Sequence, residues 1–296
     1  MPDEPVRRRR PRAAVAAALC SLLFLAGCGG AANADGRTAY ADGEGPTVIG
    51  TDGSAESRVV AELYGELLVD AGVRVRRAST RYASPADTAR AVVAGRLGLA
   101  PAYETTTLRA LPGGGTVPGD MAATLSAALP PGVVALPPAE ADNGVVLAVT
   151  RATAHRYGLR TLADLGRAGA RRTLGGPAAH DPDAPSAAAL EEVYGVRLTE
   201  TGTSATADVL VLRGTDPAIT GDGLVVLTDP ESTLPPEHVF PLIGAPYAGL
   251  SARKALARLN SRLTTARLAA LAASVEAGAS PKQTARKWLR SNGLAG

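Results

Sequence analysis

Residues 47–68 read TVIGTDGSAESRVVAELYGELL, and this stretch decides the fold because it contains both a strand and a helix. Residues 47–50 form a short β-branched run that ends at a glycine, which is typical of a strand. Apolar residues then recur at the three-and-four spacing of one helical face, at Val60, Leu63, Tyr64, Leu67 and Leu68. The stretch therefore predicts a strand followed by an amphipathic helix.

The same alternation of strand and helix continues along the chain. Residues 73–76 alternate with period two, residues 85–94 have a helical pattern, and residues 97–100 form another apolar run. Further β-rich runs lie at residues 145–149, 209–212 and 224–227. Strands that alternate with helices predict an α/β fold in which at least some strand pairs are parallel.

The C-terminal region predicts two helices. Leu268, Leu271, Ala272 and Val275 share one helical face, and Gly278 stands where that helix would end. The sequence SPKQ then begins at Ser280 and combines an N-cap serine, a first-turn proline and a glutamine. This combination predicts the start of a last helix.

The N-terminus has the order of charge and hydropathy found in export signals. Five arginines lie within residues 7–12, and residues 13–25 follow as 13 mostly apolar residues. A membrane-spanning helix needs about 20 residues, so this segment fits the core of a cleavable signal peptide. Residues 25–28, LAGC, resemble the lipobox of bacterial lipoproteins. We therefore expect residues 1–27 to be removed and Cys28 to carry lipid; the alternative is a chance cysteine after an ordinary signal peptide.

This interpretation places the protein at the cell membrane, lipid-anchored on the extracytoplasmic face. Residues 28–46 are rich in Gly, Ala, Asp and Asn without an apolar period, so we expect a flexible tether. Cys20 lies in the segment expected to be removed, so the mature chain would have no intramolecular disulfide although it is exported.

The charge balance changes when the expected signal peptide is set aside. The whole chain has 31 Lys and Arg residues against 28 Asp and Glu residues. Residues 1–27 contain five Arg, one Asp and one Glu, so 26 charges of each sign remain. A formal charge of zero gives no electrostatic reason to expect nucleic acid as a partner.

The sequence lacks the motifs of common catalytic and metal sites. None of His155, His180 and His238 stands in an H-E-x-x-H spacing, and there is neither a C-x-x-C pair nor a G-x-S-x-G elbow. We therefore expect no metal, no cofactor and no catalytic residues. An extracytoplasmic enzyme is disfavoured because no nucleophile–base pair is marked.

Several motifs occur in a fixed order after the tether. The first is IGTDGSAES at residues 49–57, which runs into AELY at residues 61–64. The others are residues 95–106, residues 157–159 with 161–165, residues 215–217, residues 224–229 and residues 263–265. This ordered set resembles the substrate-binding lipoproteins of glycine betaine/choline/carnitine/proline (osmoprotectant) ABC importers, and the chain is similar to a divergent member of that family.

The resemblance implies the two-lobed, type II periplasmic-binding-protein fold, with a double crossover hinge. The composition changes near residues 137–142 and again near residues 235–240, where we expect the two crossings. We therefore expect residues 47–138 and 240–296 to form lobe 1, and residues 139–239 to form lobe 2.

The family site holds a quaternary ammonium in a cage of tyrosines, whose ring faces attract an organic cation. Carried onto this chain, the cage keeps one ring, Tyr103, and a polar position, Asn143. Other cage positions have Val145, Arg213 and Glu237 in place of rings. Asp52 replaces an uncharged polar residue, and Thr106 and Thr215 complete the expected ligand-binding set.

Loss of three ring faces removes about 2–6 kcal/mol of cation binding. Glycine betaine should therefore bind weakly, with a dissociation constant above ~100 μM. Arg213 and Glu237 together would suit a zwitterion or a polar neutral solute; the alternative is that both are solvated residues at the rim of the site.

The resemblance thus implies a monomeric solute-binding protein that captures a small polar solute and delivers it to ABC permease subunits in the membrane. The solute is expected to belong to the glycine betaine, choline or proline class, or to be a relative. A degenerate binding fold that acts as a lipid-tethered sensor or adaptor is the alternative, because the region of residues 202–208 is shorter than in the family.

Overall fold

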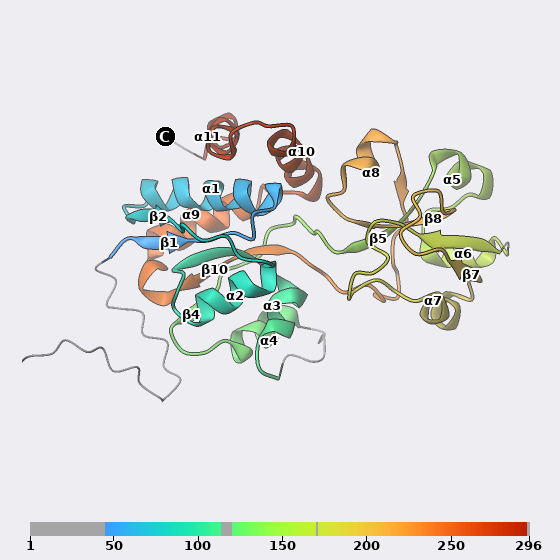
Figure 1. Cartoon of the computed structure of the whole chain (residues 1–296), viewed down its shortest axis with the longest axis horizontal. Coiled ribbons are helices and arrows are strands. Elements are labelled where there is room, and N and C mark those ends of the chain that lie inside the picture. The colour runs from blue at the N-terminus through green and yellow to red at the C-terminus, as the bar shows by residue number, and fades with distance from the viewer. Residues whose placement is uncertain (1–44, 114–119, 170, 295–296) are drawn as a thin grey trace, which may run out of the picture. The chain divides into compact units, whose positions relative to one another are not determined.

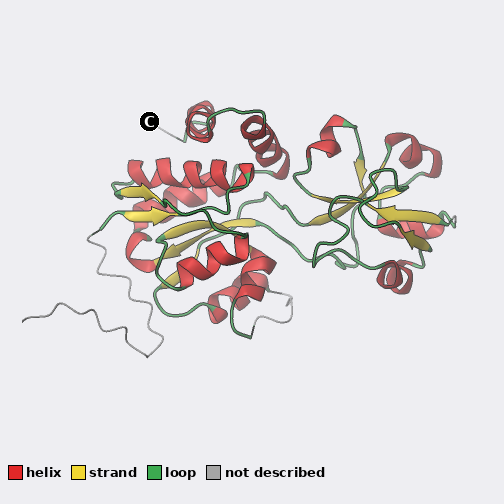
Figure 2. Ribbon diagram, viewed as in Figure 1, coloured by secondary structure: helices red, strands yellow, loops and turns green. Residues whose placement is uncertain are grey.

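The computed structural model describes residues 45–113, 120–169 and 171–294. The expected signal peptide, Cys28 and all but the end of the expected tether lie outside the described residues. Within these ranges the strands form two five-stranded sheets, each with helices packed on it (Figures 1 and 2). The prediction of an α/β fold with some parallel strand pairs is therefore confirmed.

The first sheet has the strand order β2-β1-β3-β10-β4. Its strands are β1 (Thr47–Ile49), β2 (Val75–Arg77), β3 (Leu99–Tyr103), β4 (Val133–Ala135) and β10 (Val239–Gly244). β1 is parallel to β2 and to β3, whereas β10 is antiparallel to its neighbours β3 and β4. A strand from the last quarter of the chain therefore lies inside a sheet built from the first half.

Helices pack on both faces of this sheet. On one face are α1 (Ala55–Asp70), α9 (Leu250–Asn260), α10 (Thr265–Glu276) and α11 (Pro281–Ser291). Their shared core contains Leu63, Leu256 and Leu289. The opposite face carries α2 (Pro85–Val93), α3 (Glu104–Ala110) and α4 (Met121–Ala128), packed around Phe240 (Figure 1). A short 3₁₀ turn, η1 (Ala245–Tyr247), follows β10.

The second sheet has the strand order β7-β6-β8-β5-β9. Its strands are β5 (Val145–Val149), β6 (Arg172–Gly175), β7 (Leu198–Glu200), β8 (Val209–Arg213) and β9 (Val225–Val226). The helices of this part are α5 (Arg151–Tyr157), α6 (Leu162–Arg167), α7 (Ala187–Tyr194) and α8 (Pro217–Gly221). Leu147, Leu162 and Leu190 belong to a core separate from that of the first sheet.

The chain passes from the first sheet to the second between β4 and β5, and returns between β9 and β10. The two connecting segments run antiparallel and are hydrogen-bonded to each other. The amide of Val239 donates to the carbonyl of Ala141 at 3.0 Å, and the amide of Asn143 donates to the carbonyl of Glu237 at 3.1 Å. Residues at the ends of these segments are therefore held at fixed positions next to both sheets.

The glycine at the end of β8 is required by this arrangement. A Cβ on Gly214 would lie 2.5 Å from the carbonyl oxygen of Asp142, which is closer than real Cβ contacts. The amide of Gly214 also donates to the carbonyl of Gly144 at 2.9 Å. The bare backbone thus brings Arg213 and Thr215, on either side of Gly214, against the first connecting segment.

The predicted elements are found close to their expected positions. The strand at residues 47–50 is β1, the helical face that includes Leu63 lies on α1, and the run at residues 145–149 is β5. The last helix begins at Pro281, and its N-cap is Ser280, whose side chain accepts from the amide of Gln283 as the sequence predicts. β3 begins two residues later than predicted because the amide of Leu97 still donates to Ala91 at the end of α2.

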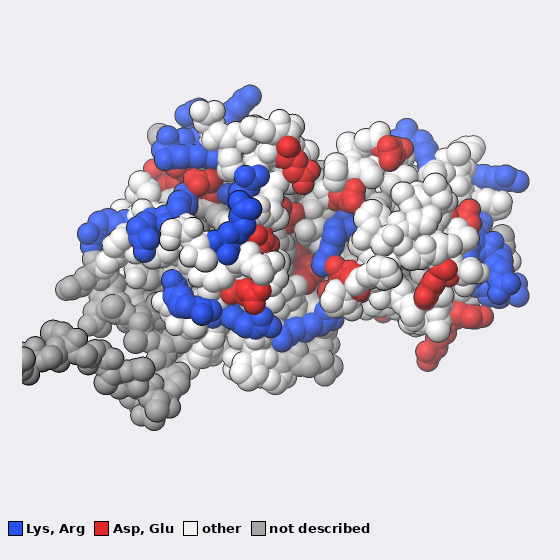
Figure 3. Space-filling model, viewed as in Figure 1, with Lys and Arg blue, Asp and Glu red and all other residues white. Residues whose placement is uncertain are grey.

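No helix in the described part of the chain combines the length and the apolar character needed to cross a bilayer. Acidic and basic side chains are mixed over the face seen in Figure 3. The mixture agrees with the near balance of charges in the sequence, because neither sign dominates this face.

Candidate ligand-binding site

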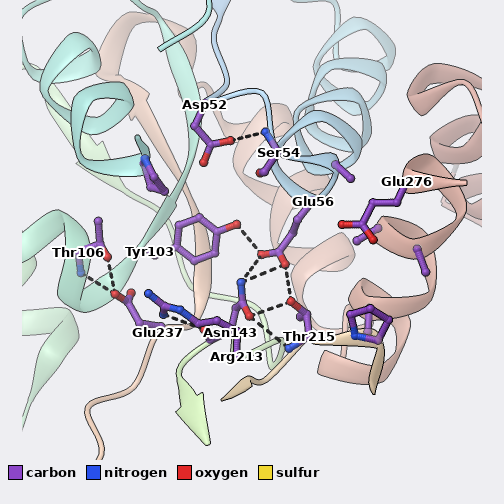
Figure 4. Close-up of a pocket in the computed structure, with 16 residues that line it drawn as sticks. Asp52, Ser54, Glu56, Tyr103, Thr106, Asn143, Arg213, Thr215, Glu237 and Glu276 are labelled. Carbon is purple, nitrogen blue, oxygen red and sulfur yellow. Dashed lines mark hydrogen bonds between the residues drawn. The ribbon is translucent and has the colours of Figure 1, made fainter. Parts of the chain in front are cut away.

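A pocket of about 280 Å³ lies where α1, the first connecting segment, β8 and α10 meet. This volume is near the lower end of cavities that hold small ligands, about 300–1,000 Å³. The lining residues are Asp52, Ser54, Ala55, Glu56, Pro85, Tyr103, Thr106, Asn143, Arg213, Thr215, Pro217, Glu237, Ala269, Ala272, Ala273 and Glu276 (Figure 4). Both sheets and both connecting segments therefore contribute to one cavity.

Most of the residues expected to bind ligand meet in this pocket. Asp52, Tyr103, Thr106, Asn143, Arg213, Thr215 and Glu237 all line it. Val145 does not. It is 2% exposed and belongs to the core of the second sheet, with Leu147 and Val149 on the same strand. The assignment of Val145 to a cage position is corrected, because its side chain faces this apolar core.

Glu56 is the centre of the hydrogen-bond network in the pocket. It lies in the first turn of α1, is 7% exposed, and accepts from the Tyr103 hydroxyl at 2.5 Å. The Asn143 amide donates to it at 3.1 Å, and the Thr215 hydroxyl lies 2.7 Å from the same carboxylate. One carboxylate thus contacts β3, a connecting segment and the loop after β8 (Figure 4).

Burial and hydrogen bonding act in opposite directions on Glu56. Burial raises the pKa of its carboxyl above 4.5, while the hydrogen bonds from Tyr103, Thr215 and Asn143 reduce this rise. The position at the start of α1 also favours negative charge, because unpaired amides converge there. Burial, with the nearby Glu56 carboxylate, holds the pKa of Tyr103 well above its usual range, so its hydroxyl remains a donor.

Glu237 is more deeply buried and less completely hydrogen-bonded. It is 1% exposed, and its Oε1 accepts from the amide of Thr106 at 2.9 Å and from the hydroxyl of the same residue at 2.5 Å. Its Oε2 is buried and has no hydrogen-bond partner in the described structure. Burial raises the pKa of Glu237 to about 7. In the described structure, half of this carboxylate therefore lacks a hydrogen-bond partner at the wall of the pocket.

Arg213 is the one basic residue among the described residues that line the pocket. Its guanidinium forms an ion pair with Asp181 and donates to the carbonyl oxygen of Asn143 at 3.0 Å. Asp181 lies in the second sheet's part of the chain and is not among the lining residues. The positive charge of Arg213 is thus directed at least partly away from the cavity. Arg213 and Glu237 are both held by protein contacts, unlike freely solvated rim residues.

Two further acids complete the polar lining. Asp52 accepts from the amide of Ser54 at 2.8 Å, and Glu276 is an exposed residue at the end of α10. Among the described residues, Tyr103 is the one aromatic residue of the lining, so the described structure shows no cage of several rings around this cavity. No three His, Cys, Asp or Glu residues of the described ranges are placed to hold a metal ion.

Glu56, Glu276 and the alanines of α10 line the pocket but are not among the site residues predicted from the sequence. Glu56 lies inside a matched motif, but an acid two residues after an N-cap serine is ordinary at a helix start. Ala269, Ala272, Ala273 and Glu276 occupy one face of α10 at the i, i+3, i+4, i+7 spacing. The small residues of this face, followed by an acidic residue, are the sequence signal that could have indicated a pocket wall.

The protein has two β-sheets covered by helices, two segments that connect them, and a polar pocket of solute size lined by all of these elements. These features define the class of extracytoplasmic solute-binding proteins. Residues 45–291 match the family described as the substrate-binding domain of ABC-type glycine betaine transport systems, and the chain belongs to that family. No curated protein sequence matches the chain.

Solved structures support the same fold at low sequence identity. The crystal structure of a glycine betaine/carnitine/choline ABC transporter is similar with a TM-score of 0.72 and 17% identity, over 84% of this chain and 99% of that chain. Apo YehZ from Escherichia coli is similar with a TM-score of 0.66 and 19% identity, over 84% and 99% of the two chains. Both are similar to this chain in fold.

Proposed function

We propose that the protein captures a small polar solute in the pocket around Glu56 and Glu237 and delivers it to the permease of an ABC importer. The observation that carries the proposal is the composition of the pocket. Polar side chains from the first sheet, a connecting segment and the second sheet converge on one cavity of about 280 Å³. A ligand there would contact both sheets, as capture between two lobes requires.

The proposal assigns binding to the pocket and no chemistry. The lining contains no His, Cys or Lys, so the described site offers none of the usual strong nucleophiles or a histidine base. The expected domains, residues 47–138 with 240–296 and residues 139–239, would be the two lobes that close on the solute.

A solute screen on the protein from residue 45 onward tests this function. Thermal shift with a panel of quaternary amines, primary amines, amino acids and polyols should identify a solute that raises the melting temperature in a saturable way. A hit would then be tested for uptake by cells with and without the protein. The proposal would be rejected if no solute of the panel stabilises the protein and if uptake of the panel solutes is the same in cells with and without the protein.

We further propose that the protein is anchored by a lipid on Cys28 and acts as a monomer on the outer side of the membrane. Support comes from the order of basic, apolar and small residues in the first 28 positions. Replacement of Cys28 by Ala should leave unprocessed precursor or release the protein from the membrane fraction. A Cys28→Ala protein cleaved at the same bond and still membrane-bound would contradict the anchor.

A further inference from the structure

The charges around the pocket are strongly unequal. In the part of the chain that the structure describes, Asp52, Glu56, Glu237 and Glu276 line it, against Arg213 as the one basic residue. The charge of Arg213 is itself compensated by Asp181, whose side chain is 14% exposed. A solute in this cavity therefore meets an excess of negative charge in a partly desolvated setting, where Coulomb interactions are stronger than in water.

The free oxygen of Glu237 adds a requirement for a donor. Oε1 is occupied by Thr106, whereas Oε2 is buried without a hydrogen-bond partner in the described structure. A buried acceptor that stays unpaired is unfavourable, so a ligand that donates to Oε2 gains more than a ligand that only carries charge. A primary ammonium or a guanidinium has N–H donors, and a quaternary ammonium has none.

The aromatic surface of the pocket favours the same choice. Tyr103 is the one aromatic residue of the lining within the described ranges, and its hydroxyl donates to Glu56. In Figure 4 the carboxylates of Asp52, Glu56 and Glu237 surround the Tyr103 ring on three sides of the view. A methylated cation needs several ring faces to replace its hydration, and a single ring does not supply them.

We propose that the pocket selects a small organic cation with N–H donors, a protonated amine or a guanidinium, over a quaternary ammonium of the same size. This inference rests on the proposed function and names the substrate class of that site. Glu237 would accept from the ligand, and Asp52 and Glu276 would attract it from a distance.

A zwitterion is less suited to this arrangement. A ligand carboxylate could be held by Arg213, but that guanidinium already binds Asp181 and the carbonyl oxygen of Asn143. The same ligand carboxylate would also lie near Glu56 and Glu237, and like charges repel at short range. The net charge of the ligand is therefore expected to be positive.

Isothermal titration with matched probes tests the selectivity. Ethanolamine and choline differ only in methylation of the nitrogen. Glycine has a carboxylate in place of the hydroxymethyl group of ethanolamine, and methylguanidine presents a planar group of donors. At pH 8 we expect ethanolamine or methylguanidine to bind the wild type about tenfold or more tighter than choline, as for a hydrogen bond to a charged group.

Three variants separate hydrogen bonding from charge. Glu237→Gln should lower the affinity for ethanolamine about tenfold or more and the affinity for choline much less. The amide side chain keeps the shape of the carboxylate but loses the charged acceptor. Glu276→Gln, at an exposed position, should lower the affinity for both cations to a similar extent. Glu192→Gln, an exposed acid of α7 outside the pocket, is the matched control and should leave both affinities unchanged.

Equal or tighter binding of choline would overturn the inference, and glycine binding tighter than ethanolamine would replace it with a zwitterion site. A hit from the solute screen combined with no binding of ethanolamine or methylguanidine would also overturn it, while the proposed function stands. Failure of every solute in the screen would reject both. A folding defect in Glu237→Gln, read by circular dichroism, leaves the ethanolamine–choline comparison and Glu276→Gln to decide.

Discussion

Glu56 and Glu237 are both buried acids of the pocket, and they differ in how completely they are hydrogen-bonded. Tyr103, Asn143 and Thr215 surround the carboxylate of Glu56, so its role is to hold together elements of both sheets. Glu237 has Thr106 on one oxygen, and no partner among the described residues on the other. Removal of Glu56 should therefore affect stability first, and removal of Glu237 should affect ligand binding first.

The raised pKa of Glu237 predicts a pH-dependent stability. Its pKa is about 7 in the folded protein against an ordinary value of 4.5, so the folded state holds the proton more tightly. Its contribution is fully present below pH 4.5 and is lost as the pH rises through 7. The shift corresponds to a loss of about 3 kcal/mol in the free energy of unfolding between pH 4.5 and 8. Urea unfolding of the wild type and of Glu237→Gln at both pH values measures it.

Only the difference in pH-dependent stability between the wild type and Glu237→Gln isolates the contribution of Glu237. His238 lies beside it, and a hydrogen bond to Glu104 raises the pKa of His238, so its stabilising contribution is also lost in an overlapping range of pH. Asp142, Asp183 and Arg213 also lie close enough to influence this region. Identical pH profiles for the wild type and Glu237→Gln would show that Glu237 titrates normally.

At the scale of elements, α10 forms a wall of small residues along the pocket. Ala273 lines the cavity, whereas Ala270 is exposed and does not. Ala273→Leu should lower the affinity for the solute identified by screening about tenfold or more, because overpacking a filled site costs about 1–3 kcal/mol. Ala270→Leu is the control on the same helix and should leave affinity unchanged. Equal affinities for the two variants would place the solute elsewhere.

The strand β5 shows why an aromatic cage cannot be restored at Val145. Val145 is 2% exposed and packs in the core of the second sheet. Val145→Tyr should lower the free energy of unfolding by about 1–3 kcal/mol through overpacking, without an increase in glycine betaine affinity. Thermal unfolding and titration with betaine check the two halves of this prediction. A stable variant with tighter betaine binding would show that the ring reaches the pocket.

At the scale of the whole molecule, two connecting segments join two separately packed sheets. Polar contacts between the two parts include Glu56 with Thr215 and Arg109 with Asp183, at 2.7 and 2.5 Å. A solute that contacts both parts should favour arrangements in which they are closer together. Small-angle scattering should therefore show a smaller radius of gyration at saturation with the solute found by screening. An unchanged radius would count against closure.

The sequence alone was sufficient for the class of fold. Local hydrophobic periodicity is set by which face of an element is buried, so β1, α1, β5 and α10 were predicted within a few residues. The strands β4, β6 and β7 are not among the elements predicted from the sequence. The motifs that resemble the family added the expected site, and seven of its eight residues line one pocket.

Tertiary structure decided which of those residues are available to a ligand. The sequence determines that Glu56, Glu237 and Arg213 are charged and roughly where they lie along the chain. It does not determine that Thr106, more than 100 positions from Glu237, satisfies one oxygen, or that Asp181 binds Arg213. Burial and hydrogen bonding depend on contacts between distant segments, which leave no local pattern. The proposed ligand preference of the pocket rests on these contacts.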